Sequence, residues 1–195
     1  MNNFHKIKIL GETRSLPLIK IDNIQIFGFD SVGDMDIILK GAKKLHKFIG
    51  DAEGSVPKPD LILTTEVKGI PLAQELARLL DINYIVLRKS QKIYMGETIS
   101  IKGGSITSGE SDYYLSKTNF ERLKNKNILF VDDVYSTGKT MDTITELCKQ
   151  TSSNFIQAVF ILQEVMNGED KDAIVHFSHN NIKCTACGTL KCTLI

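Results

Sequence analysis

The sequence is short of several residue types that mark particular classes of protein. Its 195 residues include no tryptophan, four prolines and four cysteines, and no run of about 18 apolar residues that could span a membrane. With 24 basic and 23 acidic residues, the net charge of +1 gives no general attraction to nucleic acid or anionic lipid. The N-terminus lacks the sustained apolar segment of a secretory signal. We therefore expect a cytoplasmic protein with no membrane or nucleic-acid partner.

The four cysteines do not form the framework of a small disulfide-rich domain. Three of them, Cys184, Cys187 and Cys192, are crowded near the C-terminus. Cys184 and Cys187 make a CxxC pair, which could bind zinc together with Cys192 and either His176 or His179. A second well-spaced pair is missing from the sequence. We favour the alternative, a C-terminal strand that carries free thiols.

Short apolar runs alternate with helical patterns along most of the chain. Near the start, residues 16–21 and 24–29 read as two short strands around a turn at Asp22. The apolar runs that follow are residues 61–65, 84–87, 127–131 and 156–162, and the helical patterns are residues 34–49, 69–80 and about 138–150. In the first helical pattern, one apolar stripe is formed by Ile38, Ala42, Leu45 and Ile49. Strands that are buried on both faces of a sheet read as continuous apolar runs. The pattern therefore predicts an α/β fold with a parallel β-sheet flanked by helices. The length suits a single domain over residues 1–195.

Residues 89–118 break this alternation, because they are rich in glycine, serine and threonine and contain only short alternating pieces. A connection of this length is uncommon in a compact domain unless it serves as a lid or binding loop. We expect a flexible hairpin that closes over a site, a catalytic hood at about residues 89–118. A passive surface loop is the alternative.

The stretch ILFVDDVYSTGKT, residues 128–140, ends like a triphosphate-binding P-loop, but Asp133 stands where that motif needs its first glycine. Asp132 and Asp133 follow an apolar strand, and ligands of open parallel sheets bind beyond such strand ends. The small polar residues that come next would begin a helix, whose N–H groups and dipole favour phosphate. Carboxylates can bind the hydroxyl groups of a sugar, and the loop beside them can bind phosphate. Together they predict a ribose 5-phosphate as the ligand. The alternative is a helix cap, for which one polar residue would suffice.

This stretch resembles the phosphoribosyl pyrophosphate (PRPP) binding motif of the type I phosphoribosyltransferases. TTEVKGIPLA, residues 64–73, resembles the pyrophosphate loop of that family, in which a cis peptide is common. VLRKSQK, residues 86–92, resembles the basic segment that leads into the hood. The order of parts is similar over roughly residues 20–165. The adenine and xanthine enzymes are the most similar, and the hood also resembles that of the purine-operon repressor.

The resemblance implies an enzyme of purine salvage, in which a free purine attacks C1 of PRPP with Mg²⁺, pyrophosphate leaves and a nucleoside 5′-monophosphate forms. It implies that Asp132, Asp133, Lys68 and Arg88 are catalytic, that the two aspartates also orient the metal, and that the protein is a homodimer. The alternative for the basic residues is an ordinary solvated surface. The full set of PRPP-binding residues that it implies is Glu66, Val67, Lys68, Gly69, Arg88, Lys89, Lys92, Asp132, Asp133, Val134, Tyr135, Ser136, Thr137, Gly138, Lys139 and Thr140.

The sequence leaves the purine base open. Phe27 or Phe29 could stack on its face, although phenylalanines in a strand are more often part of the core. Ser116 stands where adenine-specific enzymes carry a glutamate, and Lys139 stands where the motif has a second glycine. A rival hypothesis is a regulator that binds PRPP without turnover. Known repressors of that kind carry a DNA-binding domain, and the roughly 20 residues before the resemblance are too few for one, so we favour the enzyme.

Overall fold

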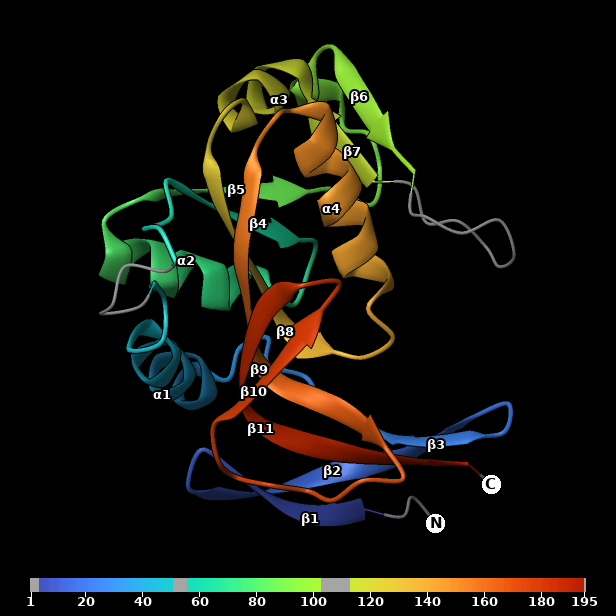
Figure 1. Cartoon of the computed structure of the whole chain (residues 1–195). Coiled ribbons are helices and arrows are strands. Elements are labelled where there is room, and N and C mark those ends of the chain that lie inside the picture. The colour runs from blue at the N-terminus through green and yellow to red at the C-terminus, as the bar shows by residue number, and fades with distance from the viewer. Residues whose placement is uncertain (1–3, 51–55, 103–112, 195) are drawn as a thin grey trace.

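The computed structural model describes residues 4–50, 56–102 and 113–194 (Figure 1). Five parallel strands lie in the order β11, β9, β8, β4, β5. Their bounds are β4 Leu61–Thr65, β5 Asn83–Leu87, β8 Asn127–Tyr135, β9 Asn154–Met166 and β11 Ile182–Leu194. The expected parallel sheet is confirmed, with β11 as a strand that the sequence reading placed only in outline.

Helices cover both faces of this sheet (Figure 1). On one face lie α1, Met35–His46, and α2, Ile70–Leu80, and on the other lies α4, Lys139–Gln150. The predicted apolar stripe of α1 is buried against the sheet at Ile38, Ala42 and Leu45. Each helix therefore packs its apolar side on the sheet and leaves its charged side in water.

The N-terminal region extends the sheet with antiparallel strands. These are β1 Phe4–Ile9, β2 Glu12–Ile21 and β3 Ile24–Phe27, and β3 pairs with the end of β11. A short strand, β10 Val175–His179, forms a hairpin with β11. The sequence predicted β2 and β3 around a turn at Asp22, but it did not predict β1 or β10.

A hairpin of β6, Thr98–Ile101, and β7, Tyr113–Ser116, lies within the expected hood. It follows a short 3₁₀ helix, η1 Ile93–Met95, and precedes α3, Lys117–Leu123. Arg88 and Tyr114 exchange two backbone hydrogen bonds of 3.0 and 2.7 Å, which fasten the hairpin to the end of β5. Residues 103–112 lie outside the described residues, so flexibility of the hood stays a prediction. In the described part of the chain, no helix is long and apolar enough to cross a bilayer.

Candidate active site

The two aspartates lie near the end of β8, next to the end of β4. The Oγ1 of Thr65 donates a hydrogen bond to Oδ2 of Asp132 at 3.0 Å, and the backbone N–H of Asp133 donates to Oδ1 of Asp132 at 2.9 Å. Asp133 is buried, with 5% of its surface exposed. Neither aspartate caps α4, because the residue at its N-cap is Gly138. The capping alternative therefore does not explain why two acids stand here.

Lys68 joins the loop after β4 to this acidic pair. Its Nζ lies 2.9 Å from Oδ2 of Asp133 and donates a 3.0 Å hydrogen bond to the carbonyl of Phe29. The hydroxyl of Ser31, a residue that sequence reasoning missed, donates to the carbonyl of Lys68 at 3.3 Å. The peptide between Glu66 and Val67 is cis, as the resemblance implies for this loop. The loop is thus held between the acidic pair and the segment that follows β3.

One carboxyl of the acidic pair, that of Asp132, has a raised pKa. Burial of the Asp132 carboxyl, followed by the neighbouring charge of Asp133, raises the pKa of Asp132 from 3.8 to about 7. The hydrogen bonds from Thr65 and from the Asp133 backbone oppose this rise in pKa without cancelling it. A carboxyl that titrates near neutral pH at a strand end is typical of functional sites.

Gly69 lets the loop that follows β4 approach β8 closely. A Cβ atom built on Gly69 would clash with Oγ1 of Thr64 and would lie 2.7 Å from Oδ1 of Asp132. Any side chain at this position would therefore have to displace the acidic pair or the strand beside it. The close approach explains a glycine here without any need for a left-handed backbone.

The basic segment lies beside the same loop, and its contacts go to Glu66 and Ser90 rather than to the acidic pair. Arg88 Nη1 is 3.5 Å from Oε1 of Glu66, and the backbone N–H of Lys89 donates to Oε2 of Glu66 at 3.1 Å. Lys92 Nζ instead donates to the hydroxyl of Ser90 at 2.7 Å. The structure therefore brings Glu66, Arg88 and Lys89 together and gives Lys92 a local partner.

The predicted phosphate loop connects β8 to α4. It borders a hollow of about 90 Å³, which the residues from Val134 to Thr140 line together with Asp132. Gly138 has a φ of +81°, a left-handed conformation that glycine adopts without strain. Ser136 and Thr137 are exposed, and Lys139 is the exposed first residue of α4. A lysine thus replaces the usual glycine at a point where its side chain can extend into solvent.

The stacking suggested for Phe27 or Phe29 needs correction. Phe27 and Phe29 are 5% and 6% exposed and belong to the core, and the ring of Phe27 stacks on His5. Neither ring has a free face for a purine in this conformation.

The zinc alternative for the cysteines, which the sequence did not favour, is also contradicted. Cys184 and Cys187 lie in different core clusters on opposite faces of the sheet. A strand alternates its side chains between faces, so these thiols cannot share one zinc ion.

The site is therefore an acidic pair, a lysine loop and a phosphate loop at one edge of a parallel sheet, which is an arrangement suited to a phosphorylated sugar. The model of the phosphoribosyl transferase domain family matches residues 29–188, and the chain belongs to this family. The adenine phosphoribosyltransferase of Campylobacter fetus is 31% identical over 138 residues, which cover 69% of this chain and 74% of that protein. The predicted type I membership is confirmed.

Regulators are also among the relatives. The purine biosynthesis transcriptional repressor PurR of Bacillus subtilis is 23% identical over 167 residues, and the match covers 85% of this chain. The chain spans only 55% of the length of that repressor, and 35% of the related regulator of Streptococcus pneumoniae.

Solved structures show that the fold is shared. Adenine phosphoribosyltransferase of Saccharomyces cerevisiae superposes with a TM-score of 0.56 at 22% identity, over 82% of this chain and 84% of the other. The enzyme of Leishmania tarentolae gives 0.57 at 18% identity, over 84% of this chain and 71% of the other.

Proposed function

We propose that this protein is a purine phosphoribosyltransferase that makes a nucleoside 5′-monophosphate from a free purine and PRPP. The observation that carries the proposal is the contact between Lys68 and Asp133, which places a cation and the acidic pair beside a phosphate loop. In the reaction, a purine nitrogen forms a bond to C1 of the ribose while the bond from C1 to the pyrophosphate oxygen breaks. The purine loses one proton, and pyrophosphate leaves with the electron pair.

Each part of the site has a role in this reaction. The hydroxyls of Ser136, Thr137 and Thr140, with the N–H groups at the start of α4, would hold the 5′-phosphate. Asp132 and Asp133 would accept hydrogen bonds from the ribose hydroxyls. The Lys68 ammonium would stabilise the negative charge that builds on pyrophosphate as it leaves. The hood would exclude water, which would otherwise compete with the purine for C1.

The acidic pair also fits Mg²⁺, because carboxylate oxygens are ligands that this ion prefers. Among the described residues, no group of three or more His, Cys, Asp or Glu side chains could hold a metal ion. Mg²⁺ commonly binds through one or two carboxylates together with substrate phosphates and water. We propose that Asp132 and Asp133 supply the protein ligands, and that the bound ion neutralises charge on pyrophosphate.

The base is best left unassigned among the purines. Ser116, which stands in place of the glutamate of adenine enzymes, caps α3 by accepting a 3.2 Å hydrogen bond from the N–H of Asn119. That structural role gives no support for adenine in particular. A homodimer and a cytoplasmic location stay predictions.

The second candidate is a regulator that binds PRPP without turnover. The similarity to the Bacillus subtilis repressor over 85% of this chain favours it. Both candidates use the same PRPP site, so binding alone does not separate them.

The discriminating experiment supplies the protein with PRPP, Mg²⁺ and, in separate reactions, adenine, hypoxanthine, guanine or xanthine. We expect nucleotide and pyrophosphate in equal amounts with at least one base, and loss of both products in Asp133→Asn. Calorimetry with PRPP runs in parallel. Binding of PRPP with no product from any base would support the regulator, and absence of PRPP binding would overturn both candidates.

A further inference from the structure

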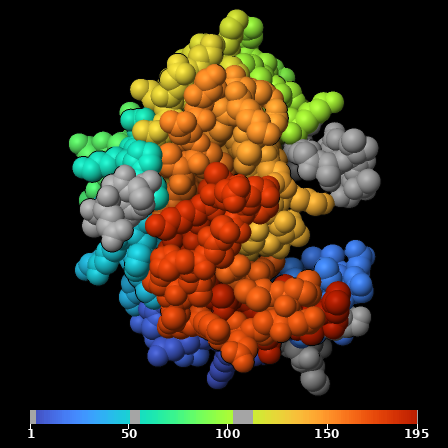
Figure 2. Space-filling view, viewed as in Figure 1, coloured from blue at the N-terminus to red at the C-terminus, as the bar shows by residue number. Residues whose placement is uncertain are grey.

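His179, at the turn of the β10–β11 hairpin, contacts both ends of the phosphate loop. His179 Nδ1 lies 3.1 Å from the hydroxyl oxygen of Tyr135, and its Nε2 lies 2.8 Å from Oδ1 of Asp142. Tyr135 is the last residue of β8, and Asp142 lies in the first turn of α4. A single imidazole therefore bridges the two ends of the loop. Figure 2 shows the C-terminal strands (red) packed directly against α4 (orange).

The imidazole also lies against the middle of the loop. A Cβ atom built on Gly138 would lie 2.8 Å from Nδ1 of His179 and 3.0 Å from the Tyr135 hydroxyl. The His179 side chain is 14% exposed. The ring of Tyr135 is itself held edge-on by Phe177 and Phe160, at centroid distances of 4.7 and 5.5 Å. The phosphate loop is thus packed against a cluster of aromatic rings, and His179 lies at the edge of that cluster.

The contact with Asp142 has a defined direction. A carboxylate only accepts hydrogen bonds, so Nε2 of His179 donates to Asp142. The hydroxyl of Tyr135 both donates and accepts, so it bonds to Nδ1 of His179 whether or not that nitrogen carries a proton. Asn180 Nδ2 donates a second hydrogen bond to the same Asp142 oxygen at 3.0 Å. The carboxylate in the first turn of α4 is therefore engaged by the hairpin.

We propose that His179 is a positioning residue that orders the phosphate loop for the 5′-phosphate of its ligand. The ligand is taken from the proposed function, but the role itself belongs to the C-terminal hairpin. Several N–H and hydroxyl donors must converge on one phosphate, and a loop that has to be ordered on binding loses affinity. By tying Tyr135 to Asp142, His179 removes this cost before the ligand arrives.

The first test measures two ligands separately by calorimetry. Ribose 5-phosphate probes the phosphate loop, and inorganic pyrophosphate probes the Lys68 loop. We expect His179→Ala to weaken ribose 5-phosphate about three- to tenfold, the effect of losing a positioning hydrogen bond, and to leave pyrophosphate unchanged. Tyr135→Phe should weaken ribose 5-phosphate similarly, and the double variant no further, because both remove the same bridge.

The matched control is His176→Ala, on the same hairpin, where the histidine is exposed and bonds to Thr185. Its affinities should equal those of the wild type. Equal weakening of ribose 5-phosphate and pyrophosphate in His179→Ala would indicate a general structural role and would overturn the proposal.

The second test needs no ligand and separates this proposal from the proposed function. Hydrogen exchange of the amides of residues 136–140 should accelerate in His179→Ala and in Tyr135→Phe, with the rest of the sheet unchanged. If the wild type bound neither ligand, the proposed function would fail while the exchange result still decided the role of His179. Exchange that is unchanged in the loop, or accelerated throughout the chain, would overturn the role.

Discussion

Lys68 and Asp133 form an ion pair in which only one partner reaches solvent. The distance between Nζ and Oδ2 is 2.9 Å, and the side chains are 45% and 7% exposed. The buried carboxylate thus depends on a lysine that is also placed to meet an incoming anion. If pyrophosphate draws Lys68 away, Asp133 becomes available to a ribose hydroxyl or a cation. The pair links the two halves of the proposed PRPP site.

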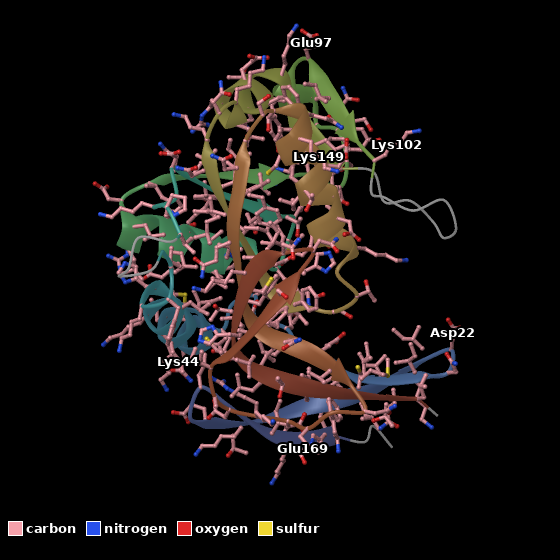
Figure 3. The ribbon with its side chains drawn as sticks, viewed as in Figure 1. Asp22, Lys44, Glu97, Lys102, Lys149 and Glu169 are labelled. Carbon is pink, nitrogen blue, oxygen red and sulfur yellow. The ribbon has the colours of Figure 1, made fainter. Side chains whose placement is uncertain are left out.

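Removal of the lysine charge tests this dependence. We expect Lys68→Met to lower the free energy of unfolding at pH 7 by about 1 to 3 kcal/mol, because Asp133 is left buried without its counter-ion. The double variant Lys68→Met/Asp133→Asn should regain part of that loss. Urea denaturation measures both, with Lys149→Met on the exposed side of α4 as the control (Figure 3). Equal stability of Lys68→Met and the control would contradict a stabilising pair.

Gly69 tests the close approach of the loop to β8. Gly69→Ala should lower the free energy of unfolding by about 1 to 3 kcal/mol, because its methyl group has no space beside Thr64 and Asp132. It should also weaken pyrophosphate binding in calorimetry.

The control is Gly11→Ala, in the turn between β1 and β2, where φ is +87° and no atom lies within 4 Å of the added Cβ. That change should cost about 1 to 2 kcal/mol from backbone strain alone and leave ligand binding intact. Wild-type pyrophosphate affinity in Gly69→Ala would refute the role of this contact.

The thiols offer a test of the sheet geometry. Burial raises the pKa of Cys148, Cys184 and Cys187 to about 12, and it also raises the pKa of Cys192. Thiolate is the reactive form, so the native protein at pH 8 should react only slowly with an aromatic disulfide reagent. All four thiols should react at once in urea. Rapid reaction of the native protein would contradict the burial of the thiols. Zinc that stays bound to the protein after incubation with zinc and dialysis would contradict the exclusion of a zinc site.

Local sequence was sufficient for the parts of the fold that repeat a strong pattern. The apolar runs that form β4 and β8 are buried on both faces of the sheet. The small polar residues of the phosphate loop follow β8 directly and are consecutive in the sequence. The acidic pair and the phosphate loop are therefore encoded in one continuous stretch. That is why their place at the carboxyl end of a strand could be predicted before the structure.

Contacts between distant segments were beyond this reasoning. His179 meets Asp142 across 37 residues, and neither residue lies in the stretches that resemble the motifs of the family. β11 mixes threonine, cysteine and glycine, so its period is weak although most of it is buried. Phe27 was a candidate for stacking because a phenylalanine in a strand gives the same sequence pattern whether it belongs to the core or to a binding site. Only tertiary packing separates these two outcomes.

Asp132 predicts a dependence of stability on pH. Its pKa in the folded protein, about 7, exceeds the ordinary value of 3.8, so between these values the folded state holds a proton that the unfolded state has lost. Stability should therefore fall as the pH rises through this range. In EDTA, Asp132→Asn should raise the free energy of unfolding by about 1 to 3 kcal/mol at pH 8 and change it little at pH 4, since an amide stays neutral. Urea denaturation at both pH values checks this, with Glu97→Gln on the exposed hairpin as the control (Figure 3). A gain that is the same at pH 4 and pH 8 would show that the charge of Asp132 is not its cause.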